Sequence, residues 1–218
     1  MSTSNLERAA VGVAAAGASA AENNTAVDEL IAKIRDESDQ VRADAWTNAG
    51  DVGAPAVKPL AAVMTDDALE VARAAKRAVW KIVRHSGRPG ADAERTAVVD
   101  ELIALLADAQ PGSVRREVLW MLSEIGGDEA VDPIVPLLSN EELRENARMA
   151  LERIPVQKSI EALKAGIDAA PKDFKLNIAQ SLRKRGIKVP GLPCAKLTPA
   201  KQTHVKPYTP PEAKDEKE

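Results

Sequence analysis

Two nearly identical stretches of helical patterning occur in one chain. The first, VDELIAKIRDES, begins at Val27, and the second, VDELIALLADAQ, begins at Val99. In both, apolar residues recur at intervals of three and four, which places them on one face of an α-helix. A duplicated amphipathic helix predicts a repeat architecture, because each unit can bury its apolar face only against its neighbours.

A second type of helix occurs five times. The five copies begin at Val41, Val71, Val114, Leu143 and Phe174. Four residues after each start stand Ala45, Ala75, Val118, Ala147 and Ile178, and eight residues after it stand Ala49, Val79, Leu122, Leu151 and Leu182. The eleventh position continues the apolar stripe through Val52, Ile82, Ile125 and Ile154, but Arg185 breaks it in the last copy. This spacing predicts one buried stripe along each helix.

Partner helices are expected between these copies. Their predicted bounds are Thr25–Arg35, Ala54–Met64, Ala93–Ala107, Asp128–Ser139 and Val156–Ala169. The sequence therefore predicts an all-α fold, an α-solenoid of about five helix pairs over residues 25–189. Residues 1–24 are expected to be a flexible or helical N-terminal segment. Residues 190–218, which hold six of the fourteen prolines, are expected to form an extended or disordered tail.

Composition supports a helical core and gives few hints of a partner. The chain is 44% hydrophobic but only 2% aromatic, which suits helices packed through small aliphatic side chains. A net charge of −3 gives no general reason to expect nucleic acid. Cys194 is the single cysteine, and no stretch approaches the roughly 20 apolar residues of a membrane span. The Ala-rich start matches the pattern of a secretory signal only weakly. We therefore expect a cytoplasmic protein, with export as the alternative.

The repeated pattern resembles that of HEAT repeats of the short, phycobilisome-lyase type. VRREVLWMLSEIGGDEAVDPIVPLL, from Val114, matches the pattern closely, and VRADAWTNAGDVG, from Val41, matches well. The second and fifth copies depart from it, with Ala72 and Lys175 at the position of the arginine. The resemblance covers about residues 25–187. It implies an interaction surface far more often than an enzyme, and it implies that the second helix of each pair lines the concave side.

Two further features have both structural and functional interpretations. The step from the second to the third copy carries about thirteen extra residues, centred on His85–Glu94, which we interpret as a tolerated surface insertion, with a binding loop as the alternative. A basic residue also recurs one position after most helix starts: Arg42, Arg115, Arg144 and Lys175. We interpret this series as pairing with acidic residues in neighbouring turns that joins one repeat to the next, and we keep an anion site as the alternative.

Motifs for catalysis and metal binding are sparse. His85 and His204 are the two histidines, and neither stands in the His-Glu pair that the resemblance to iron-dependent HEAT hydroxylases would require. Cys194 lies in a proline-flanked tail without a base beside it. Acidic pairs such as Asp66-Asp67 stand near helix starts, where they complement the helix dipole. We therefore expect no enzymatic activity, no cofactor and no metal.

The tryptophans point away from the predicted core. At about 100° per residue, Trp46, Trp80 and Trp120 project at least about 120° from the centre of the apolar stripe. We expect Trp46 to pack sideways on the next repeat. The expected partner-binding residues on the concave face are Trp80, Trp120, Arg73, Arg77, Arg84, Arg116 and Met149. The alternative is that the N-terminal segment or the tail covers the two tryptophans.

These residues favour a non-catalytic scaffold that binds an acidic or extended segment of another protein. Tryptophan and arginine are the residues most enriched at the energetic centres of interfaces. A nucleic-acid-binding HEAT-like protein and a HEAT-type lyase or enzyme accessory subunit remain the alternatives.

Overall fold

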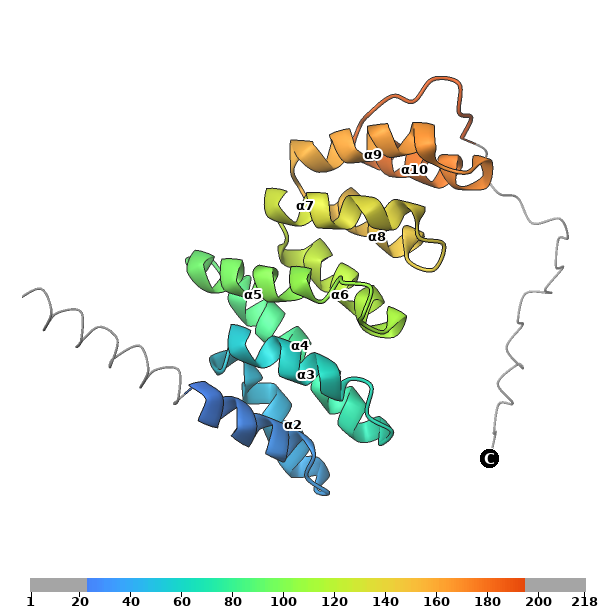
Figure 1. The fold of residues 1–218 in the computed structure, drawn as a ribbon. Helices are drawn as coiled ribbons and strands as arrows, with labels where there is room; N and C mark the ends of the chain where they lie inside the picture. Colours follow the sequence, from blue (N-terminus) through green and yellow to red (C-terminus); the bar gives the residue numbers. More distant parts are fainter. Residues whose placement is uncertain (1–22, 195–218) are drawn as a thin grey trace, which may run out of the picture.

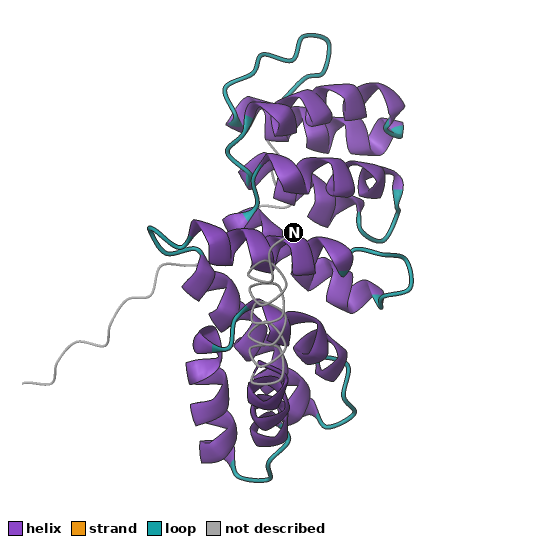
Figure 2. Ribbon diagram, turned by 60° about the vertical axis from the view of Figure 1, so that its left-hand side comes forward, coloured by secondary structure: helices purple, strands orange, loops and turns teal. Residues whose placement is uncertain are grey.

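The computed structural model describes residues 23–194 as helices and their connections (Figures 1 and 2). The first pair joins a helix over residues 23–34 to α2 (Asp39–Asn48), which ends in the 3-10 turn η1 (Ala49–Asp51). The later pairs are η2–α3 (Ala54–Ala56, Val57–Val63) with α4 (Leu69–Ser86), α5 (Asp92–Ala104) with α6 (Gly112–Ile125), α7–η3 (Asp128–Ile134, Val135–Ser139) with α8 (Arg144–Arg153), and α9 (Gln157–Ala169) with α10 (Lys172–Lys184).

The pairs stack in chain order, from α2 at the blue end to α10 at the orange end (Figure 1). Second helices pack on neighbouring second helices, with α4 between α2 and α6, and α8 between α6 and α10. First helices do the same through α3, α5, α7 and α9. Within the described part of the chain, this neighbour-on-neighbour arrangement confirms the predicted α-solenoid and its five helix pairs.

The predicted apolar stripe is the core. Every residue at its fourth and eighth positions is buried, from Ala45 in α2 to Leu182 in α10. First helices add their own buried aliphatics, such as Leu60 in α3 and Leu102 in α5. Phe174 is the large aromatic side chain of this core, and the Arg144 guanidinium lies over its ring at 5.0 Å. Small and branched side chains let adjacent pairs approach closely, which explains how a chain with few aromatics builds one continuous core.

Prolines stand in the 3-10 turns of two of the first helices. Pro136 has no N–H to donate to the carbonyl four residues earlier, and α7 ends at Ile134 and continues as the tighter 3-10 turn η3. In the second pair the 3-10 turn η2 precedes α3, and Pro55 stands at its start, where a missing N–H interrupts no helical hydrogen bond. The first helices of these two pairs are therefore short, while α4 extends over eighteen residues.

Arg185 ends the apolar stripe as predicted, and its guanidinium caps the neighbouring helix. It donates to the carbonyls of Ile154 at 2.7 Å and Val156 at 3.1 Å, just past the end of α8. After Gly186, whose φ of +78° suits glycine, the chain folds back and the Ile187 amide donates to the Leu182 carbonyl at 2.9 Å.

The C-terminal segment continues to pack on α10 for a few residues. Val189 packs on the core, and Arg183 donates to the Leu192 carbonyl. The predicted tail from 190 onward is described only through Cys194, and the rest of it, like residues 1–22, lies outside the described residues. Among the helices the structure describes, none is long and apolar enough to cross a membrane.

Candidate interaction surface

The seven predicted partner-binding residues all lie on the second helices α4, α6 and α8. We call them the Trp/Arg strip: Arg73, Arg77, Trp80, Arg84, Arg116, Trp120 and Met149. Trp120 is 41% exposed, and the three arginines of α4 are exposed. Trp80, Arg116 and Met149 are half-buried. The structure places these residues on three successive helices, in two patches with carboxylates between them.

The first patch is a shallow pocket on α4, which we call the α4 pocket. It has a volume of about 250 Å³ and is lined by Trp46, Lys76, Arg77, Trp80, Lys81 and Arg84. The Arg77 guanidinium lies 5.6 Å from the centroid of the Trp46 ring, and that of Arg84 lies 4.9 Å from Trp80. Stacking of this kind holds a guanidinium in place and leaves N–H groups at its edge to donate hydrogen bonds.

Three residues of this pocket were not predicted as site residues. Trp46, which we expected to pack sideways on the next repeat, packs partly on the core, stacks with Arg77 of the next pair and forms one wall of the pocket. Lys76 and Lys81 stand on the same helix as the predicted arginines. The signal that could have found them is the concentration of five basic residues between Arg73 and Arg84, on a helix whose opposite face is apolar.

Carboxylates of α6 lie between the two patches. Glu117 accepts from the Trp80 indole N–H at 3.2 Å and from Lys76 at 3.0 Å, which ties α4 to α6. Glu124 pairs with Arg84 at 3.5 Å. The arginines alone suggested a uniformly basic surface, but these carboxylates make it mixed in charge. Lys76 and Arg84 are partly neutralised, whereas Arg77 and Lys81 have no carboxylate partner among the residues the structure describes.

The second patch surrounds Trp120 on α6 and α8. The Arg153 guanidinium lies 5.8 Å from the Trp120 ring centroid, and Arg116 pairs with Glu142 at 2.5 Å. Arg153, one helical turn after Met149 on α8, was not predicted as a site residue. It reaches the indole because α8 packs on α6, and the pattern of a single helix does not show this contact. Each tryptophan of the described chain thus carries one stacked arginine.

A polar network on the other side of α8 joins this helix to α10. Glu152 accepts from Arg148 at 2.9 Å, from the Ser181 hydroxyl at 2.7 Å and from Lys184 at 2.9 Å. Burial by itself would raise the pKa of Glu152, but the hydrogen bonds from Ser181 and Lys184 and the positive charges of Lys184 and Arg148 outweigh it and lower that pKa. The network links α8, which carries Met149 and Arg153, to α10.

The recurring basic residue has a structural partner in each of the four copies that carry it. Arg42 pairs with Asp39, Arg115 with Asp108 at 2.8 Å, and Arg144 with Asp173 at 3.2 Å, which links α8 to the start of α10. Lys175 donates to the Asp168 carbonyl at 3.3 Å. The Arg115 side chain is only 8% exposed. These contacts fit the ion-pairing interpretation, although only the Arg144 pair joins one repeat to the next.

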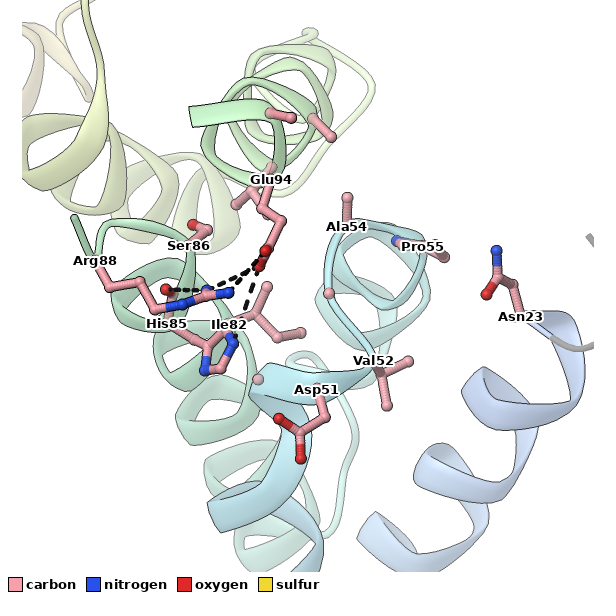
Figure 3. A pocket seen from close by; sticks show the side chains of 15 residues that line it. Asn23, Asp51, Val52, Ala54, Pro55, Ile82, His85, Ser86, Arg88 and Glu94 are labelled. Carbon is pink, nitrogen blue, oxygen red and sulfur yellow. Dashed lines mark hydrogen bonds and ion pairs between the residues drawn. The ribbon is translucent and has the colours of Figure 1, made fainter. Parts of the chain in front are cut away.

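The insertion borders a larger cavity of about 580 Å³, which we call the insertion pocket (Figure 3). Arg88 of the insertion donates twice to Glu94, at 2.7 and 2.8 Å, and once to the His85 carbonyl at 2.7 Å. The hydrogen bond from Arg88 lowers the pKa of Glu94, and the same bond raises the pKa of Arg88. The two charged side chains satisfy each other, and the loop is therefore folded against the start of α5.

Side chains that could bind a metal ion or act in catalysis lie apart from one another in the described part of the chain. Across 23–194, no three histidine, cysteine, aspartate or glutamate side chains gather in a way that could hold a metal ion. The exposed Cys194 thiol faces the Gln180 amide oxygen at 3.7 Å. His204 lies outside the described residues.

Comparison with known proteins finds similar solved structures and one matching family model. A designed armadillo repeat protein is similar to 71% of this chain over 80% of its own, with 21% identity and a TM-score of 0.40. An engineered protein is similar over 72% of this chain and 78% of its own, with 22% identity and a TM-score of 0.39. No curated protein matches the sequence. The family model described as HEAT repeats matches residues 99–183, from the second half of α5 through most of α10.

Proposed function

We propose that this chain is a non-catalytic scaffold that binds an extended, acidic segment of a partner protein across α4, α6 and α8. The observation that carries the proposal is the Trp/Arg strip, in which the half-buried Trp80 and the exposed Trp120, each with a guanidinium group stacked on its ring, lie on successive second helices. Repeat solenoids commonly serve as interaction surfaces, and their extended faces suit an extended ligand. In this proposal the strip faces the concave side of the stack.

The indoles and the arginines have separate tasks in this proposal. Trp120 supplies apolar surface that becomes buried on binding. Trp80 does the same with the face of its ring that Arg84 does not cover. Arg77 supplies charge-assisted hydrogen bonds to carboxylates. Arg116 and Arg73 stand at the margin of the strip, each already paired with a glutamate, and contribute mainly to the rate of association.

Capture from a native lysate with the full chain as bait tests the scaffold function. The variant Trp80→Ala/Trp120→Ala should lose the captured partner and keep its helical circular dichroism. Val135→Ala, an exposed apolar residue of η3 on the first-helix side, is the matched control and should retain the partner. A partner that binds the double tryptophan variant as well as it binds the unmodified chain would reject this surface.

A further inference from the structure

We infer that the α4 pocket is an anchor for two acidic residues that are separated by one residue in an extended peptide. The inference rests on the proposed function and specifies which residues of the partner the pocket would bind. It begins with Arg77 and Lys81, the two cations of the pocket that have no carboxylate partner among the described residues. Other basic side chains of α4 are paired: Arg73 with Glu70, Lys76 with Glu117, and Arg84 with Glu124.

The spacing of the two cations selects the spacing of the ligand. Arg77 and Lys81 are four residues apart on α4, so their positions differ by about 6 Å along the helix axis. In an extended chain, residues two apart lie on the same side at roughly 6.6 Å. Two acidic residues separated by one residue therefore reach both cations together, whereas adjacent acidic residues point to opposite sides.

The indoles define what stands beside the acidic pair. The polar edge of Trp80 is already occupied, because its N–H donates to Glu117. An apolar side chain next to the acidic pair is therefore the ligand that fits the space between the Trp46 and Trp80 rings. Because Arg77 is already stacked on Trp46, little side-chain entropy is lost when it binds a carboxylate.

The surroundings favour a peptide over a nucleic acid. Glu117 and Glu124 lie next to the pocket, 3.0 Å from Lys76 and 3.5 Å from Arg84, and they would repel a backbone that carries a charge at every nucleotide. Nucleic-acid surfaces present a continuous run of basic residues. Two unpaired cations beside two carboxylates match a ligand with two charges.

Synthetic peptides and the full chain provide the test, with affinities measured by fluorescence anisotropy at fixed salt. The probe peptide carries Glu-Gly-Glu followed by leucine. Its controls carry Gln-Gly-Gln, or the same two glutamates side by side. We expect the probe to bind at least tenfold more tightly than either control. Equal binding of all three peptides would overturn the inference.

Variants of the two cations complete the test. Arg77→Ala/Lys81→Ala should weaken the probe at least tenfold, whereas Lys164→Ala/Lys172→Ala, two exposed lysines without an ion pair in the described chain, should leave it unchanged. Arg77→Glu/Lys81→Glu should instead bind a Lys-Gly-Lys peptide. Loss in the lysine control, or tighter binding of single-stranded oligothymidine than of the probe, would overturn the inference.

Two outcomes separate this inference from the scaffold function. If the probe fails but capture still depends on Trp80 and Trp120, the anchor is wrong and the scaffold stands. If capture fails as well, both fall. Light scattering tests the alternative that a second copy of the chain occupies the pocket. A dimer that dissociates in the Arg77→Ala/Lys81→Ala variant would assign the pocket to that second copy and overturn the inference.

Discussion

Single carboxylates control both the stability of this stack and the charge of its surface. Glu152 is the clearest structural case, because three donors from two helices converge on a side chain that is only 12% exposed. Glu117 is the clearest functional case, because it lies between the α4 pocket and the rest of the Trp/Arg strip. One conservative substitution at each position tests these roles separately.

Glu152→Gln should lower the free energy of unfolding by about 1 to 3 kcal/mol at pH 7, because the neutral amide leaves charged donors poorly paired. The pKa of Glu152 is lowered in the folded chain, so its stabilising contribution is present above the ordinary glutamate value near 4.3 and is lost as pH falls through the lower folded pKa. Urea unfolding of both proteins between about pH 7 and pH 3 should show the difference shrinking in acid. A difference that stays constant over this range would contradict the assignment.

Glu117→Gln should strengthen binding of the acidic probe peptide severalfold. The glutamine oxygen can still accept from the Trp80 N–H, so the helices remain in place, while the pocket loses the negative charge that competes for Lys76. The gain should be larger at low salt than at high salt. Glu101→Gln, which removes the carboxylate of a comparable lysine pair on the first-helix side, is the control and should have no effect. Unchanged affinity in Glu117→Gln would show that the peptide does not reach this edge of α4.

At the scale of helices, the end of α6 is set by a close contact that a methyl group would disrupt. The Gly126 amide donates to the Leu122 carbonyl at 2.8 Å, and a Cβ at this glycine would lie 2.6 Å from that same oxygen and 3.0 Å from the Ala130 Cβ. Gly126→Ala should therefore cost about 1 to 3 kcal/mol in thermal or urea unfolding. Gly112→Ala, at the start of the same helix, would meet only the flexible end of Glu142 and should be nearly neutral. Equal losses would attribute the effect to alanine in general.

The periodic sequence predicted helices well and contacts between helices less well. The apolar stripe placed Ala75 and Val79 in the core correctly, because burial along one helix depends only on its own period. The arginine over Trp120 comes from α8, and the carboxylate bound to Trp80 comes from α6. Such contacts depend on the register between stacked helices, which the period of one helix does not encode.

Arg185 shows a second limit of the pattern. An arginine at a core position indicates a broken repeat, and the sequence alone offered no other interpretation. The structure places its guanidinium on the carbonyls that α8 leaves unpaired at its end, so the last repeat satisfies backbone polar groups where earlier repeats bury an aliphatic side chain. Recognising such a cap from sequence requires knowing which helix end lies opposite.

At the scale of the whole molecule, the helix pairs that the structure describes pack chiefly on their neighbours, so a local loss should spread by a predictable distance. Arg95 on α5 also caps a second helix, but it caps α6 of its own pair, donating to the Ile125 carbonyl and to Glu129 of α7 at 2.9 Å each. One cap lies in the middle of the stack and the other at its end. In a one-dimensional array, a weakened middle junction uncouples both sides, whereas a weakened end junction frees only the last pair.

Arg185→Met should therefore lower the free energy of opening of α9 and α10 by about 2 to 3 kcal/mol, since several carbonyls lose a charged donor. Amide hydrogen exchange should show this loss in α9, α10 and the end of α8, with protection in α2 and α4 unchanged. Arg95→Met should instead reduce protection on both sides of α6, from α5 through α8. Exchange that rises uniformly along the chain in either variant would mean that the stack unfolds as one cooperative unit. In that case the Trp/Arg strip would be held by the entire solenoid, and the neighbours of α4 and α6 would have no special part in its stability.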